Sequence, residues 1–400
     1  MNKEKQSFGR VLWKIIRVIL IIIAVILVGA VIMLFAISPA KIDPLKDQNG
    51  KKYPNGIAER VMIDVGDMKL GAFLLGEDVD NPVLLYMHGG PGMPVLFMDD
   101  SHYFPERLEK YFTVCYLDQR GVGASYDKNM PLEKLNDQLM IEDTKAVTDY
   151  LIERFDQEKI YLFGISWGTC LTTQTAHKYP DSYMAVINTG QVADSVRSER
   201  ETYDYLSRLA EENNDEKSLA LLQKYNPDMN PKALITKDYL YDVRAPIVEK
   251  YKLGSSHFKT SSLWHPISSV LTFKGYTVME KLNIYKGSML SLEHIQASEN
   301  IMNDFTKQEV PFFIIMGEYD FQTTANLARE FYDKMDAPIK EFVLFKNAAH
   351  FISGDYPQDF AKYVASVIDK VEINRDSTSL TNEYEMEAEP EFFEDFVLKK

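Results

Sequence analysis

Short apolar runs alternate with helical segments over most of this chain. The apolar runs have the length of β-strands and lie at 83–87, 113–117, 160–163, 185–188, 312–316 and 341–345. The segments that repeat apolar positions with a helical period are 142–155, 169–178, 324–335 and 357–371. Strands that alternate with helices indicate an α/β fold with a mostly parallel sheet and helices on both faces. Residues 61–75 alternate loosely and predict a β-hairpin before the first of these strands.

This alternation is interrupted once, between residues 192 and 300. The interruption is charged, rich in tyrosine and mostly helical in pattern, so we expect a helical cap inserted at 192–300. The α/β core is then divided into a first part at 57–191 and a second part at 301–372. Polar residues with proline and glycine predict a linker at 41–56. Residues 374–400 are acidic and poor in core residues, which predicts a solvated, disordered tail.

The N-terminal region predicts a membrane anchor. Residues 18–37 are an almost pure run of isoleucine, leucine, valine and alanine, with no charge between Arg17 and Lys41. Because about 20 apolar helical residues span the core of a bilayer, we expect a transmembrane helix after a short tail at 1–17. The alternative is a cleaved signal peptide, since Ser38-Pro39-Ala40 offers small residues for cleavage. Signal peptides have apolar cores of about 7–15 residues, shorter than this one.

Charge predicts the orientation of the anchor and excludes one class of partner. Five basic residues precede the span and place the N-terminus in the cytoplasm, although four lysines also follow it. We therefore expect a single-pass protein of the cell membrane with its large domain extracellular. The net charge of −15 argues against a nucleic-acid partner, because phosphates require a basic surface.

Cysteine and histidine usage predicts neither a disulfide framework nor a metal site. The two cysteines, Cys115 and Cys170, fall in a predicted strand and a predicted helix and are expected to be core thiols. The seven histidines lack the spacing of metal ligands. We predict no metal and no organic cofactor.

The pentapeptide Gly164-Ile165-Ser166-Trp167-Gly168 lies where a predicted strand meets a predicted helix. Gly-x-Ser-x-Gly at such a turn is the nucleophile elbow of serine hydrolases. The glycines permit a turn too sharp for Cβ atoms beside the serine, whose hydroxyl is left exposed. The following helix points the positive end of its dipole at this spot. Ser166 is therefore the predicted nucleophile.

A serine hydroxyl needs a base to remove its proton, and the base needs a carboxylate to orient it. His350 follows the last predicted strand, and Asp320 follows the strand before it. The resulting chain order of serine, acid and histidine is the order of this kind of site. Glu318 is the close rival for the acid, and we expect Asp320.

The segment His88-Gly89-Gly90-Pro91-Gly92 directly follows a predicted strand. Acyl transfer places negative charge on the carbonyl oxygen, and preorganised backbone amides stabilise it. We expect the Gly90 and Trp167 amides to form this oxyanion hole, with His88 and Gly89 supporting the loop. A plain connecting loop is the alternative, but it would not need three glycines and a proline.

Residues 118–125, Asp-Gln-Arg-Gly-Val-Gly-Ala-Ser, follow another predicted strand. The Gly-x-Gly could suggest dinucleotide binding, but the third glycine of that motif is absent. We expect a structural role in which Asp118 and Arg120 brace the loops beside the site.

Three motifs together resemble one branch of a known superfamily. His-Gly-Gly-Pro-Gly at 88–92, Asp-Gln-Arg-Gly-x-Gly-x-Ser at 118–125 and Gly-x-Ser-Trp-Gly at 164–168 occur together in the proline iminopeptidase-like branch of the α/β-hydrolase superfamily, peptidase family S33. The resemblance covers the chain from Asn55 to Val371. It implies an eight-stranded core with a helical cap, the same nucleophile, acid and histidine as above, and removal of an N-terminal residue, often proline, through an acyl-enzyme.

The cap departs from this resemblance. The family commonly carries a Trp-x-x-Trp-Glu motif whose carboxylate holds the substrate's ammonium group, whereas the nearest segment here reads Leu263-Trp264-His265-Pro266. The chain has Asn188-Thr189-Gly190-Gln191 where iminopeptidases typically have an Arg-Gly pair. Other glutamates of the cap region include Glu199, Glu201, Glu211, Glu212, Glu249 and Glu293. The resemblance therefore implies the catalytic machinery more strongly than the substrate.

We expect a membrane-anchored serine hydrolase that cleaves amide bonds of a small peptide through an acyl-enzyme. The activity we expect is that of a prolyl aminopeptidase. The alternative is a carboxylesterase or amidase whose small acyl substrate has no free amine. A non-catalytic binding module is the third hypothesis, and the complete set of triad and oxyanion residues disfavours it. Epoxide hydrolases and dehalogenases are excluded, because they need a carboxylate at the position of Ser166.

Overall fold

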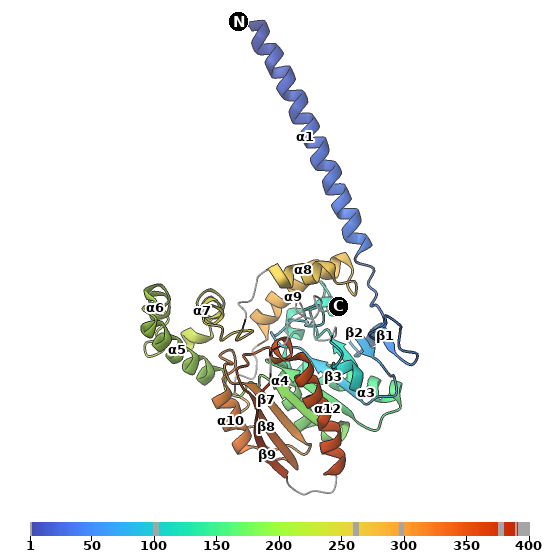
Figure 1. The fold of residues 1–400 in the computed structure, drawn as a ribbon, viewed down its shortest axis with the longest axis vertical. Coiled ribbons are helices and arrows are strands. Elements are labelled where there is room, and N and C mark those ends of the chain that lie inside the picture. The colour runs from blue at the N-terminus through green and yellow to red at the C-terminus, as the bar shows by residue number, and fades with distance from the viewer. Residues whose placement is uncertain are drawn as a thin grey trace.

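A nine-stranded sheet runs through the large domain (Figure 1). The computed structural model describes residues 2–98, 104–258, 264–295, 300–374, 380–388 and 390. The strands are β1 (Ile57–Asp64), β2 (Lys69–Gly76), β3 (Val83–Met87), β4 (Thr113–Leu117), β5 (Ile160–Ile165), β6 (Tyr183–Thr189), β7 (Phe312–Gly317), β8 (Ile339–Phe345) and β9 (Leu380–Met386). Their order is β1-β2-β4-β3-β5-β6-β7-β8-β9. The predicted hairpin is the antiparallel pair β1–β2, and the strands from β4 to β9 pair in parallel.

Helices cover both faces of this sheet, as predicted. Every residue of β3, β4, β5 and β7 is buried, which is why these strands read as continuous apolar runs. One face packs against α3 (Asp137–Phe155), α4 (Gly168–Lys178) and α10 (Ala325–Lys334). The other packs against α2 (Leu108–Tyr111) and α12 (Pro357–Ile373), which α11 (Ile352–Asp355) precedes. Cys115 and Cys170 are free, buried thiols, as expected.

A group of helices lies between β6 and β7, in the stretch where we expected a cap. These helices are α5 (Ser195–Glu212), α6 (Glu216–Gln223), the π-helix Tyr239–Arg244, α7 (Ala245–Lys250), α8 (Trp264–Thr272) and α9 (Val278–His294). The first part of the group has a small core of its own, which includes Leu206, Leu222 and Val248. Asp194 caps α5 by accepting a hydrogen bond from the Arg197 amide. Thr277 and Glu280 form a capping box that starts α9.

Helix α1 (Asn2–Ala36) projects from the domain as a single long rod (Figure 1). Its segment Trp13–Ala36 has 24 residues, and none of the apolar window in it is buried inside the protein. At 1.5 Å per residue this segment is about 36 Å long, enough to cross a bilayer. By length and composition it qualifies as a membrane span, and a signal sequence near an N-terminus passes the same test.

The C-terminal region corrects one prediction. We expected residues 374–400 to be disordered and the core to have eight strands, but Leu380–Met386 adds a ninth strand, β9, parallel to β8. Backbone pairing with β8 holds this mostly exposed strand, and basic side chains compensate its glutamates, as in the ion pair of Arg329 with Glu383. Residues 375–379, 389 and 391–400 of the predicted tail lie outside the described residues.

Candidate active site

Ser166 lies at the turn from β5 into α4, as its motif predicts. Its φ of +55° is rare for a residue with a side chain and marks a strained turn. A Cβ atom on Gly164 would lie 2.7 Å from the Thr172 hydroxyl, and one on Gly168 would lie 2.4 Å from the Met87 carbonyl oxygen. Both glycines of the motif are therefore required by close packing, and they hold a half-buried Ser166 at the carboxyl edge of the sheet.

His350 and Asp320 form a buried pair at the same edge of the sheet. The His350 Nδ1 lies 2.7 Å from the Asp320 Oδ2, and the Asp320 side chain is fully buried. The amides of Gln322 and Thr323 each donate to Asp320 Oδ1 at 2.9 Å, and the Thr323 hydroxyl donates to Oδ2 at 2.9 Å. These donors keep the carboxylate in one orientation. Its bond to Nδ1 places the imidazole proton there and leaves Nε2 as the basic nitrogen.

Gly190 connects this pair to the serine. The Ser166 amide donates to the carbonyl of Thr189 at the end of β6. The next residue is Gly190, with φ +60°, and a Cβ atom there would lie 2.8 Å from His350 Cε1. The imidazole of His350 therefore packs on the backbone that follows Thr189, because position 190 has no side chain. Sequence reasoning recorded Gly190 only as a departure from the family pattern and missed this role.

Glu318, the rival acid, has other partners. Its carboxylate accepts from Lys346 Nζ at 2.6 Å and from the Asn347 amide at 3.0 Å. Sequence reasoning also missed Thr323, the hydroxyl that orients Asp320. A threonine three residues after an aspartate at a strand end was the available signal.

The loop at 88–92 lies directly against Ser166. A Cβ atom on Gly89 would lie 2.8 Å from the Ser166 Cβ and 2.9 Å from the Ile165 carbonyl oxygen. Gly90 follows with φ +116°. In the part of the chain that the structure describes, neither the Gly90 amide nor the Trp167 amide donates to a protein acceptor. Both donors are therefore free to bind an oxygen of another molecule.

His88 ties this loop to the neighbouring one. Its Nδ1 donates to the Gly89 carbonyl at 3.0 Å, and its Nε2 accepts from the Gln119 amide at 3.3 Å. Burial lowers the pKa of His88 to about 4, so the imidazole is neutral at pH 7. A neutral ring with both nitrogens engaged has a structural role.

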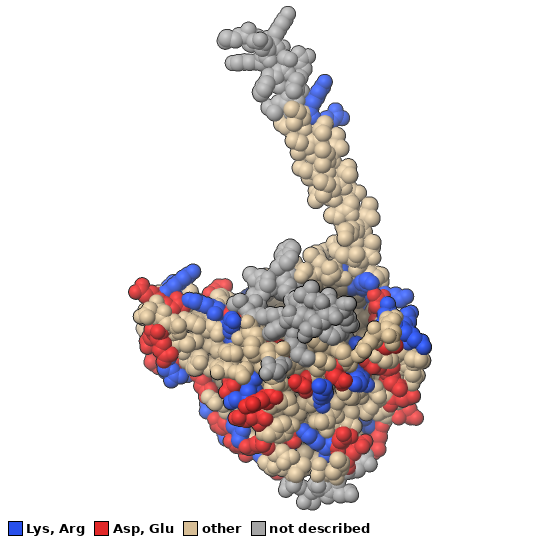
Figure 2. All heavy atoms as spheres, in the orientation of Figure 1, with Lys and Arg blue, Asp and Glu red and all other residues tan. Residues whose placement is uncertain are grey.

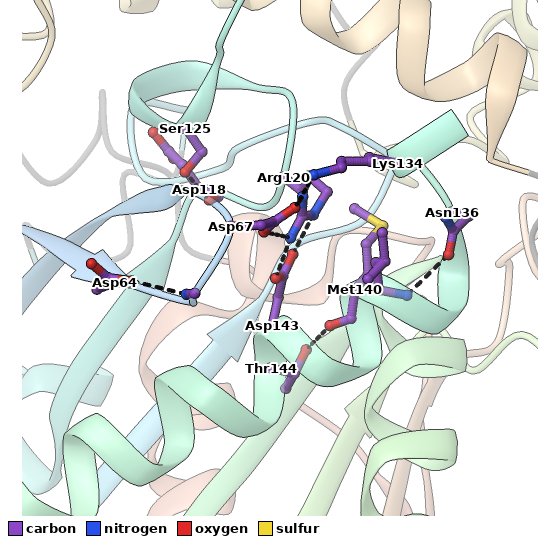
Figure 3. Close-up of polar contacts among 12 residues, drawn as sticks. Asp64, Asp67, Asp118, Arg120, Ser125, Lys134, Asn136, Met140, Asp143 and Thr144 are labelled. Atoms are coloured by element: carbon purple, nitrogen blue, oxygen red, sulfur yellow. Dashed lines mark hydrogen bonds and ion pairs between the residues drawn. The ribbon is translucent and has the colours of Figure 1, made fainter. Parts of the chain in front are cut away.

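Arg120 is the centre of a buried ion-pair network (Figure 3). Its guanidinium forms two hydrogen bonds with Asp143 at 2.7 and 2.6 Å. It forms two more with Asp67 at 3.0 and 2.8 Å, and Lys134 also reaches Asp67 at 3.0 Å. The network joins the loop after β4 to α3 and to the β1–β2 turn. It therefore fixes the loop at 118–125.

Among the described residues, Asp118 has hydrogen-bond donors but no cation in contact. Its Oδ2 accepts from the Ala124 amide at 2.7 Å, and its Oδ1 accepts from the Tyr276 hydroxyl at 2.9 Å. Burial raises the pKa of Asp118 to about 7. Because Tyr276 lies between α8 and α9, this bond ties the loop after β4 to the helical insertion. No local pattern in the sequence indicates this long-range partner.

A cavity of about 430 Å³ opens beside Asp320. Its lining residues include Glu201 on α5 and Thr324 at the start of α10, and Ser166 is not among them. Glu199, also on α5, is buried 3.4 Å from the Nε of Arg244. Burial raises the pKa of Glu199 to about 7. Of these two α5 glutamates noted in the sequence, Glu201 lines the cavity, whereas Glu199 is paired with Arg244.

The described residues contain no group of three or more His, Cys, Asp or Glu side chains that could hold a metal ion.

Comparisons with known proteins agree with this architecture. The sequence model of the alpha/beta hydrolase fold family matches residues 82–357. The probable aminopeptidase YbaC of Bacillus subtilis strain 168 is 29% identical over 302 residues, which cover 75% of this chain and 92% of that protein. The proline iminopeptidase of Thermoplasma volcanium is 26% identical over 299 residues, or 72% of this chain and 88% of that protein. The predicted resemblance is confirmed.

A solved structure extends the comparison to the fold. The crystal structure of the proline iminopeptidase of Mycobacterium smegmatis matches with a TM-score of 0.58 and 18% identity. The match covers 79% of this chain and 100% of that one.

Replacing Arg120 by methionine should lower the free energy of unfolding by about 3–5 kcal/mol, because it leaves the buried Asp143 carboxylate without its cation. Lys134→Met removes only the partly exposed pair with Asp67 and should cost less than about 1 kcal/mol. Urea titrations of the full chain, followed by circular dichroism, measure both values. Equal effects of the two substitutions would contradict the assigned role of Arg120.

Asp118 should make the folded state less stable as the pH rises. The ordinary carboxyl pKa is 3.8 and that of folded Asp118 is about 7, so between these values the folded chain keeps a proton that the unfolded chain releases. Stability contributed by this proton is complete below 3.8 and is lost as the pH rises toward 7. Asp118→Asn removes the titrating group, so its unfolding midpoint should fall less than that of the wild type over this range.

The matched control for that experiment is Asp64→Asn, at the exposed end of β1. It should leave the pH dependence of the unfolding midpoint as it is in the wild type. A wild-type slope retained by Asp118→Asn would show that the carboxyl does not titrate in this window.

Proposed function

This chain belongs to the α/β-hydrolase fold family, and on that premise we propose that it is a membrane-anchored serine hydrolase that cleaves amide bonds through an acyl-enzyme. The observation that carries this proposal is the buried His350–Asp320 pair, 2.7 Å apart, packed on Gly190 directly beside the turn that bears Ser166. A nucleophile, a base and an orienting acid at one edge of a sheet suit acyl transfer.

In the proposed reaction Ser166 attacks the substrate's carbonyl carbon as His350 Nε2 accepts the proton of the hydroxyl. The amides of Gly90 and Trp167 then bind the oxygen on which negative charge develops. His350 returns the proton to the leaving amine, and the C–N bond breaks to give the acyl-enzyme. Water, activated by the same imidazole, releases the acyl group. Asp320 holds the imidazole in the required tautomer throughout.

For the substrate we propose a small peptide with a free N-terminus, as for a prolyl aminopeptidase of family S33. The relatives named as aminopeptidase and proline iminopeptidase support this choice. Glu201 supports it physically, because it lines the cavity whose wall includes Asp320 and can attract an ammonium group there.

A second candidate is an esterase or amidase for a small acyl substrate without a free amine. The observation in its favour is that Glu199, the other α5 carboxylate, is buried next to Arg244 and so has a cation already. The family's tryptophan–glutamate cap motif is also absent from the sequence. A binding module without catalysis is the weakest of the three hypotheses, since no triad or oxyanion residue is missing.

The anchoring part of the proposal rests on α1. Its apolar segment Trp13–Ala36 is long enough to cross a bilayer and is not buried by the domain. The basic residues before it favour a cytoplasmic N-terminus and an extracellular catalytic domain in a single-pass protein of the cell membrane.

Ser166→Ala should lower kcat for amide and ester substrates by roughly a millionfold, because the other groups of a triad contribute little without the nucleophile. Steady-state assays on the purified full chain measure the loss, and an unchanged unfolding midpoint shows that the turn still forms. A fluorophosphonate probe should label the wild type at Ser166 and leave the variant unlabelled. Activity retained by the folded Ser166→Ala protein would contradict the proposed serine mechanism.

Acetylation of the substrate's amine separates the two candidate functions. A proline naphthylamide should be cleaved and its N-acetyl form should not, if a free amine is required. Glu201→Gln should then lower kcat/KM for the free-amine substrate about tenfold or more, the value of a lost bond to a charged group. The control Glu212→Gln, at the exposed end of α5, should not. The second candidate would be favoured by equal cleavage of the two naphthylamides. It would also be favoured by cleavage of short acyl esters without cleavage of either naphthylamide.

A further inference from the structure

Helices α8 and α9 expose a stripe of large apolar side chains. The five residues, here called the outer face, are Ile267 (47% exposed), Leu271 (41%), Met279 (63%), Leu282 (63%) and Tyr285 (74%). They recur at intervals of three or four residues, so each helix presents them on one side. Solvent-facing sides of helices normally carry polar residues, and a contiguous apolar stripe marks a surface that contacts another apolar phase.

The opposite side of α9 packs on the domain. Val278, Ile284 and Ser288 are among its buried residues. The Ser288 hydroxyl donates to the Gly92 carbonyl at 2.5 Å, and a Cβ atom on Gly287 would lie 2.5 Å from the Gly121 carbonyl oxygen. Helix α9 therefore has an inner side on the loops of the candidate active site and an exposed apolar outer side.

The end of α1 is fastened to these two helices. Lys281, on α9, is buried, and its ammonium donates to the Leu271 carbonyl at 2.7 Å and to the Ile37 carbonyl at 3.3 Å. A cation at the carbonyl ends of two helices is electrostatically favourable. The Lys41 amide adds a bond to the Lys274 carbonyl at 3.0 Å. The apolar segment of α1 ends at Ala36, so it ends at the level of α8 and α9 (Figure 1).

The chemistry around the outer face matches a bilayer surface. Tyrosine and lysine are typical of the level at which lipid headgroups meet water, and Tyr285 and Lys286 are exposed neighbours on α9. In Figure 2 charged side chains are spread over the visible face of the domain, its upper edges included, whereas the part of α1 next to the domain is free of them.

We propose that the outer face of α8 and α9 lies in the interface of the membrane that α1 crosses. This inference rests on the anchoring role proposed for α1. A bilayer around Trp13–Ala36 has its surface where α1 ends, and the carbonyl there is held by Lys281 of α9. The same helix bonds to Gly92, so contact with lipid on one side of α9 steadies the Gly90 loop on the other.

The test places one environment-sensitive fluorophore at a time on the full chain, reconstituted into vesicles of phosphatidylcholine and phosphatidylglycerol. Cys115 and Cys170 are buried, so a cysteine introduced at the surface is labelled selectively in the native protein. Leu282→Cys reports on the outer face, and Val28→Cys reports on the middle of α1. Ile373→Cys, on the exposed end of α12 far from α1 (Figure 1), is the matched control.

We expect the emission of labelled Leu282→Cys to shift to the blue and to be quenched by lipids that carry a nitroxide near the headgroup. The Val28→Cys label should be quenched by a nitroxide deep in the acyl chain, and the Ile373→Cys label by neither. Quenching at Val28 without quenching at Leu282 would overturn this inference and leave the anchor intact. A blue shift at Leu282 without lipid quenching would show that a second copy of the chain covers the face, which also overturns it. No quenching at Val28 would overturn the anchor itself, and the inference with it.

Discussion

The turn from β5 into α4 leaves no space for side chains around Ser166, and this shortage of space shapes the surrounding loops. A Cβ atom on Gly89 would lie 2.8 Å from the Ser166 Cβ, and one on Gly168 would meet the Met87 carbonyl at 2.4 Å. A Cβ atom on Gly190 would likewise lie too close to the His350 imidazole. Three strand ends, those of β3, β5 and β6, can therefore converge on one point. The convergence brings backbone amides and an imidazole next to a serine held at positive φ.

The buried carboxylates of Asp143 and Asp118 are compensated in two different ways. Asp143 is neutralised by the guanidinium of Arg120, which makes the loop after β4 a rigid support. Asp118 accepts hydrogen bonds from the Ala124 amide and the Tyr276 hydroxyl, and burial raises its pKa to about 7. The support within the core is thus an ion pair, whereas the connection from core to helical insertion is a hydrogen bond to a group that can be protonated. The second connection is the weaker one.

The sequence was sufficient to predict those strands and helices whose burial dictates their composition. The bounds of β3 and β4 match the predicted apolar runs because strands buried on both faces are continuous apolar segments. The sequence was insufficient to predict β9, in which five of seven residues are exposed. This strand is held by backbone pairing and by partners such as Arg329, 54 positions away from Glu383. No local pattern can report such contacts.

The same distinction applies to the candidate site. Motifs and chain order predicted Ser166, Asp320 and His350, and the structure brings the last two into contact, while their catalytic roles stay predictions. Thr323 and Tyr276 were missed because their importance comes from what they touch in three dimensions.

The helices between β6 and β7 reach the surroundings of the candidate site in two chemically distinct ways. Helix α5 brings carboxylates to the side of Asp320, where Glu201 lines the cavity. Helix α9 brings small polar side chains to the loop that carries Gly90, with the Ser288 hydroxyl bonded to Gly92. Because α9 is also the helix fastened to α1 through Lys281, the position of the domain relative to α1 and the position of the Gly90 loop are set by one rigid element.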